Sequence, residues 1–177
     1  MRINILIVIF YLVFNLLYPV EELDKGKTTV TGNIPSSVDN SPIPPCFLPS
    51  LSVNHVNTIL ECNKVIDSGL YPERAYYNRG LAYLKLGKYN LALADCLTSI
   101  ELSPQDARGY YNCGISHYEL GNYEQALKEF TTTTELAPNW MMGYYKRAMT
   151  FVELDQWADA EYDNLYAWYL NRLHYKN

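Results

Sequence analysis

The stretch ARGYYNCGISHYELGNYEQAL, residues 107–127, contains two adjacent tyrosines, Tyr110 and Tyr111. The same doublet occurs 34 residues earlier, at positions 76–77, and 34 residues later, at positions 144–145. Self-similarity at a fixed period of this size is the sequence signature of a repeat architecture. The doublets therefore predict a repeated structural unit of 34 residues.

Each unit has the pattern of two helices joined by a turn. A large residue is followed four positions later by a small one and three further on by an aromatic or histidine. A turn residue comes next, and a second apolar periodicity is centred on an alanine. Gly87 and Gly121 are expected to end the first helix, and Pro104 and Pro138 the second. The small residues are expected to let the two helices approach closely, at Gly80, Gly114 and Ala148 opposite Ala92, Ala126 and Ala160.

This pattern resembles the tetratricopeptide repeat family, over about residues 73–174. The resemblance implies an all-α superhelix (an α-solenoid) of helical hairpins, with repeat 1 at 73–106 and repeat 2 at 107–140. Repeat 3, at 141–177, departs from the pattern at Asp155 and Asn164 and has an extended final helix. Residues 51–72 match only the second half of a unit and are expected to form a half-repeat helix.

The first 50 residues differ in character from the repeats. One cation, Arg2, precedes the apolar run of residues 3–17, and acidic residues follow from Glu21. This charge layout is typical of a signal peptide or membrane anchor at residues 1–20, with residues 3–18 associating with the membrane. A helix of this length rises only about 22 Å, which favours a signal peptide, but no small-residue cleavage site follows. Both interpretations stay open.

Residues 21–50 are rich in proline, serine and threonine and predict an extended, disordered linker. We therefore expect the protein to be exported or membrane-anchored, with its amino terminus in the cytosol and its repeats on the far side. The cysteines, at positions 46, 62, 96 and 113, lack metal-site spacing. They are interpreted as small buried hydrophobic residues, with disulfides as the alternative in an exported chain.

The two members of each tyrosine doublet cannot share one helix face, because neighbouring residues point about 100° apart. The first members, Tyr76, Tyr110 and Tyr144, are expected in the core. By resemblance, the second members lie on the concave surface, where the first helices of the repeats gather. The candidate partner-binding groove comprises Arg74, Tyr77, Asn78, Arg108, Tyr111, Asn112, Tyr145 and Lys146. Its amides would hold a peptide backbone and its cations a carboxylate, whereas the alternative is a solvated face of mutually stacked tyrosines.

Two further groups of residues bear on the site. Only Asn112 and Lys146 match the two-carboxylate clamp of the chaperone-binding members of the family, so we do not expect recognition of that acidic motif. Arg79 and Arg147 are each followed sixteen residues later by an aspartate, which predicts structural ion pairs within a repeat. Repeat 2 has Cys113 in place of the arginine, which leaves Glu129 without a partner.

The composition argues against several classes of function. The net charge of −5 and the absence of a basic stripe argue against nucleic-acid binding. No catalytic motif, metal spacing or cofactor motif occurs, and the three histidines are scattered, so we do not expect an enzyme. The sequence predicts a protein–protein interaction scaffold that binds a partner peptide or helix. The alternative is a self-associating assembly protein that forms a homodimer through its aromatic final helix.

Overall fold

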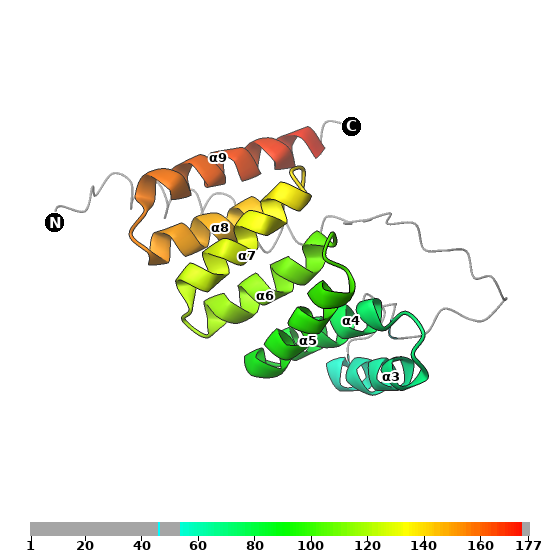
Figure 1. Cartoon of the computed structure of the whole chain (residues 1–177). Helices are drawn as coiled ribbons and strands as arrows, with labels where there is room; N and C mark the ends of the chain where they lie inside the picture. The colour runs from blue at the N-terminus through cyan, green and yellow to red at the C-terminus, as the bar shows by residue number, and fades with distance from the viewer. Residues whose placement is uncertain (1–45, 47–53, 175–177) are drawn as a thin grey trace. The chain divides into compact units, whose positions relative to one another are not determined.

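The computed structural model describes Cys46 and residues 54–174 (Figure 1). Within these residues the chain forms seven α-helices and no strand. The predicted apolar amino-terminal helix and the linker lie outside the described residues. The helices are α3 (His55–Ser68), α4 (Pro72–Lys85), α5 (Tyr89–Leu102), α6 (Ala107–Glu119), α7 (Tyr123–Leu136), α8 (Met141–Glu153) and α9 (Trp157–His174).

The helices pack as successive hairpins, α4 with α5, α6 with α7 and α8 with α9, as predicted, and α3 packs against α4 (Figure 1). Each hairpin also contacts the next, through α5 with α6 and α7 with α8. The first helices of successive hairpins touch one another, α4 with α6 and α6 with α8, whereas the second helices of the described array make no comparable contact. The first helices are therefore crowded together in one layer, as on the inner side of a curved solenoid.

The turn between the helices of each hairpin requires a left-handed backbone at one position. Gly87 and Gly121 take φ values of 68° and 76° there, and Asp155 takes 58° in the third hairpin. Aspartate is among the few residues with a side chain that visit this region readily. The departure from glycine in the third repeat therefore leaves the turn intact.

Small residues bring the two helices of each hairpin into close contact, as predicted. Ala92, Ala126, Ala148 and Ala160 are buried. A Cβ atom added at Gly114 would lie only 2.5 Å from Cε1 of Phe130 on α7. This position of α6 can therefore carry no side chain while a phenylalanine stands opposite it.

The first tyrosine of each doublet is less buried than expected. Tyr76, Tyr110 and Tyr144 are all half-buried, and their expected place in the core is wrong. The fully enclosed positions on these helices belong to smaller neighbours, among them Ala75 and Gly109. Close packing between helices leaves no room for a phenol ring at the contact itself, so the ring lies at its margin.

Candidate functional site

Arginine side chains link three helices in the first and third hairpins. Arg79 donates two hydrogen bonds to Asp95, at 2.8 and 2.7 Å, and a third, from Nη1 at 2.6 Å, to Asn63 on α3. The guanidinium also lies 5.3 Å from the ring centre of Tyr76, at cation–π distance. The predicted ion pair is therefore confirmed, and it extends to the preceding helix.

The third hairpin repeats this arrangement. Arg147 donates to Asp163 at 2.6 and 2.8 Å and to Oγ1 of Thr134 on α7 at 2.8 Å. Its guanidinium lies 5.4 Å from the ring centre of Tyr144. The first tyrosine of the doublet thus accompanies the arginine three residues later on the same helix.

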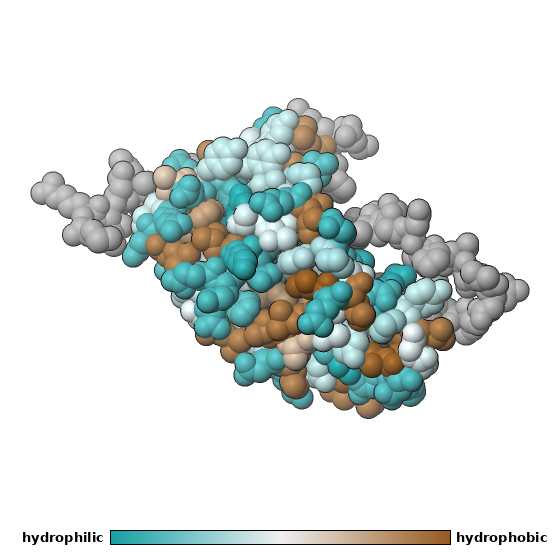
Figure 2. Space-filling view, in the orientation of Figure 1, coloured by the Kyte–Doolittle hydropathy of each residue, from teal (hydrophilic) through white to brown (hydrophobic). Residues whose placement is uncertain are grey.

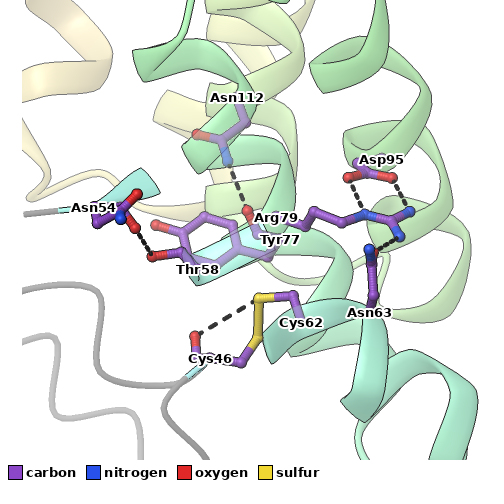
Figure 3. The surroundings of a disulfide bond; sticks show 9 residues. All are labelled: Cys46, Asn54, Thr58, Cys62, Asn63, Tyr77, Arg79, Asp95 and Asn112. Carbon is purple, nitrogen blue, oxygen red and sulfur yellow. Dashed lines mark hydrogen bonds and ion pairs between the residues drawn. A yellow bond between two sulfur atoms is a disulfide. The ribbon is translucent and has the colours of Figure 1, made fainter. Parts of the chain in front are cut away.

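In the second hairpin a disulfide takes over this link to the preceding helix. Cys113 is bonded to Cys96 on α5, and both residues are buried. A second disulfide joins Cys46 to Cys62 on α3, next to the Arg79 network (Figure 3). The interpretation of the four cysteines as buried residues holds, but the alternative pairing also applies, since none of the four is free.

Glu129 occupies the position of Asp95 and Asp163 in its repeat, and the arginine opposite it is missing, as predicted. Its side chain is half-buried, and burial raises the pKa of its carboxyl above the ordinary value, although Lys128 partly opposes the shift. The second hairpin therefore exchanges an ion pair for a covalent link and keeps one poorly compensated acid.

The inner layer of first helices carries a cluster of two arginines and one aspartate. Asp106, the N-cap of α6, accepts the backbone N–H of Arg108 at 3.0 Å and side-chain donors of the same arginine at 2.6 to 3.0 Å. Burial opposes the charge of Asp106, but the hydrogen bonds from Arg108 and the nearby charge of Arg74 outweigh it and lower the pKa of the carboxyl. The cluster carries one net positive charge.

Arg108 also holds the second tyrosine of the first doublet. Its guanidinium lies 5.0 Å from the ring centre of Tyr77. Burial raises the pKa of the Tyr77 phenol, although Arg108 opposes this shift. The ring is therefore fixed between its own helix and the first turn of α6.

The second doublet fixes its tyrosine through other rings. Tyr111 lies 4.6 Å from Trp140 and 5.9 Å from Phe130, measured between ring centres. In the third hairpin, Lys146 on α8 points its ammonium toward the sulfur of Met149 at 4.0 Å, and Tyr145 is half-buried beside it. Arg74, Tyr77, Arg108, Tyr111, Tyr145 and Lys146 all retain partial exposure, and we call this set the inner strip.

The two asparagines predicted to hold a peptide backbone do not face solvent. Asn78 is 5% exposed and Asn112 is 1% exposed. Asn112 donates its side-chain N–H to the carbonyl oxygen of Tyr77 at 3.4 Å, which joins α6 to α4. The tight contact between first helices encloses both amides, so their assignment to the groove surface is wrong.

Sequence reasoning missed two residues that shape the inner strip. Asp106 precedes α6 as an N-cap and lies two residues before Arg108, a spacing that brings cap and arginine together. Trp140, the N-cap of α8, closes over Tyr111 from the next hairpin. The capping position was readable from the sequence, whereas the aromatic contact depends on how adjacent hairpins dock.

The described residues give no indication of catalysis or of metal binding. No group of three or more potential metal ligands comes together among them. The Nδ1 atom of His117 is buried without a hydrogen-bond partner, and burial lowers the pKa of the imidazole. His117 is therefore a packing residue in the aromatic position of its repeat. Among the same residues, no helix has the length and apolar character needed to cross a membrane.

Comparison with known proteins supports the assignment of the repeats. The tetratricopeptide repeat models match residues 73–106 and 107–140. No curated protein matches the chain. Among solved structures, the MamA RS-1 ArsTM double mutant is similar, with a TM-score of 0.66, 22% identity, and coverage of 73% of this chain and 72% of that one.

Two further solved structures share the fold. The second tetratricopeptide domain of Spaghetti (RPAP3), bound to the HSP90 peptide SRMEEVD, has a TM-score of 0.54 and 21% identity over 55% of this chain and 91% of that one. TTC0263, a protein of Thermus thermophilus, has a TM-score of 0.60 and 20% identity over 66% of each chain. Family models, helical hairpins and structural neighbours agree: the chain carries tetratricopeptide repeats at residues 73–106 and 107–140.

Proposed function

We propose that the protein is an interaction scaffold that binds an extended segment or a helix of a partner protein along its inner strip. The single observation that carries the proposal is the row of partly exposed tyrosines on α4, α6 and α8, two of which are held in place by Arg108 and Trp140. Rings that are already fixed lose little conformational freedom on binding and offer a large apolar area. The fold itself supports protein binding in the coarse sense only, since partner choice lies in surface side chains.

The charge of the inner strip favours a partner segment with acidic residues. Arg74, Arg108 and Lys146 contribute three cations, and Asp106 neutralises one of them. A solved neighbour, RPAP3, is bound to a peptide with two adjacent glutamates. The inner strip lacks most of the two-carboxylate clamp, so we do not propose that same peptide as the ligand.

We further propose that the repeats work in an oxidising compartment, outside the cytosol. All four cysteines pair in two disulfides, and such bonds persist in exported proteins but are rare in the reducing cytosol. The apolar run of residues 3–17 supports the same placement, as either a signal peptide or an anchor. Alkylation of cells lysed in acid would test it: modification of all four thiols without prior reduction would exclude the oxidised state.

A photo-crosslinking amino acid at Ile115, one turn beyond Tyr111 on α6, tests the binding surface. The control carries the same probe at Gln125, which is exposed on α7. We expect the first probe to capture a defined protein in the native cell and the second to capture none of it. Binding of that purified protein should then weaken in Arg74→Glu/Lys146→Glu and stay unchanged in Lys128→Glu, a charge reversal on the outer helix α7. Equal capture at both positions would contradict the proposal.

A further inference from the structure

The final helix has an outer face unlike those of the equivalent helices before it. The exposed apolar residues Tyr162, Leu165, Tyr169 and Leu173 follow one another at intervals of three and four residues. Tyr162 alone is 68% exposed. This spacing places them on one stripe, which we call the outer stripe of α9, and it is the spacing of helices that pair lengthwise.

The outer stripe lies opposite the face by which α9 packs onto the array. The buried residues of α9 are Ala160, Asp163, Asn164 and Ala167. At 100° per residue, their mean direction lies about 160° from that of the outer stripe. Packing within the hairpin therefore does not account for the outer stripe.

Comparison within the repeats shows that this composition is specific to α9. On α7, the residues 34 positions before Tyr162, Leu165 and Tyr169 are Lys128, Thr131 and Glu135. Helix α7 therefore carries polar side chains where α9 carries two tyrosines and a leucine. On α5 the apolar content is intermediate, and exposed leucines such as Leu97 gather there (Figure 2). The outer side of a second helix in this array does not need apolar residues in order to fold.

The tyrosines of α9 are also held in place. Tyr166 packs on Tyr144 of α8, with ring centres 4.6 Å apart. Tyr162 and Tyr169 flank it, at 6.5 and 6.2 Å between ring centres. The outer stripe is thus anchored in the third hairpin, so little side-chain freedom is lost when a second surface covers it.

The charges beside the outer stripe indicate what that surface is. Glu161 and Arg172 are exposed on one edge of the stripe, eleven residues apart, and Asp159 is exposed on the other edge. If two copies of α9 pair antiparallel about a two-fold axis near residues 166–167, Glu161 of one copy faces Arg172 of the other, twice. A parallel pair would instead bring Glu161 near the second copy's Asp159, acid against acid.

We propose that the protein forms a homodimer through the outer stripe, with the two copies of α9 antiparallel. The described helix is about 27 Å long, so the contact is smaller than a standard interface of roughly 800 Å² per partner. The dimer is therefore expected to be weak and dependent on concentration. It leaves the inner strip uncovered, so one dimer presents two partner-binding surfaces.

Sedimentation velocity of the full-length chain in a non-denaturing detergent tests the proposal over a wide concentration range. We expect a reversible monomer–dimer equilibrium in the native chain. Tyr162→Lys/Tyr169→Glu gives α9 the residues that α7 carries and is expected to raise the dissociation constant about tenfold or more. Leu97→Thr makes the matching change on α5 and should leave the equilibrium unchanged. Circular dichroism and thermal unfolding confirm that both variants fold.

Charge exchange tests the orientation of the two copies. Glu161→Arg and Arg172→Glu should each weaken the dimer alone, and an equimolar mixture of the two variants should recover it. This recovery has no explanation within one chain, because each variant contributes only one changed residue. A chain that stays monomeric at all concentrations overturns the proposal. An equal effect of Leu97→Thr, or a tighter dimer in Glu161→Arg alone, also overturns it.

Discussion

Cys113 is bonded to Cys96 at the position of the first helix where the other two hairpins carry Arg79 and Arg147. All three side chains reach the preceding second helix: Arg79 binds Asn63, Cys113 binds Cys96, and Arg147 binds Thr134. The array therefore fastens each hairpin to its predecessor at one repeating position, with two different chemistries.

Removal of this disulfide should be partly reversible by importing the ion pair. Cys96→Ala/Cys113→Ala opens a link between residues 17 apart and should lower the free energy of unfolding by about 3 kcal/mol. Adding Arg at 113 and Asp at 129 recreates the pair seen between Arg79 and Asp95, so the triple variant Cys96→Ala/Cys113→Arg/Glu129→Asp should recover part of the loss. Urea unfolding measures both. A triple variant no more stable than the double would show that the two links are not interchangeable.

Breaking the ion pair of the third hairpin from one side should cost more than removing it whole. Arg147→Ala leaves the carboxylate of Asp163, which is 1% exposed, without compensation, at a cost of about 3 kcal/mol or more. Arg147→Ala/Asp163→Ala should be less destabilised than the single variant. Lys64→Ala, which removes a surface pair with Glu61, serves as control and should change stability by less than about 1 kcal/mol. Chemical unfolding that ranks the double variant below the single would contradict this account.

Glu129 should make the fold less stable as the pH rises. Its pKa is raised in the folded chain, so the folded state holds its proton to higher pH than the unfolded state does. Stability is therefore lost as the pH rises from the unfolded pKa through the folded one. Glu129→Gln should stabilise the chain at neutral pH by less than about 1 kcal/mol, because the group is half-exposed, and should have no effect below the unfolded pKa. Thermal unfolding against pH checks the sign, and a stabilisation that is equal at all pH values would exclude this cause.

The contact between Gly114 and Phe130 should tolerate a methyl group only if the ring is reduced. Gly114→Ala places a carbon within 3 Å of three ring atoms and should cost about 1 to 3 kcal/mol. Gly114→Ala/Phe130→Leu should be less than additive, since the smaller side chain gives way. The third hairpin already carries Ala148 at this position, with Asn164 opposite in place of a ring. Unfolding of the four members of this cycle gives the coupling energy directly.

The hairpins, their turns and the two ion pairs were readable from the sequence, because each depends on residues at fixed spacing within one unit. The period of 34 places Arg79 and Asp95 on facing helices, and it places Asp155 at the turn position of Gly87 and Gly121. Such relationships need no knowledge of how neighbouring units dock.

The exposure of the inner strip was not readable in the same way. Asn78 and Asn112 lie one residue beyond the second tyrosines, and whether that direction meets solvent or the next first helix depends on the distance between α4 and α6. The disulfides show the same limit, since four cysteines allow three pairings. Cys62 and Cys96 occupy equivalent positions, yet one is bonded to a residue before it and the other to a residue after it.

The bond between Cys46 and Cys62 also changes how mechanical load travels through the chain. Tension applied from the amino-terminal side reaches Cys46 and crosses the sulfur bridge to the middle of α3, so residues 47–61 carry none of it while the bond is intact. A pull from a membrane or from a moving partner would then act on the interior of a helix packed against α4, instead of unravelling that helix from its first turn.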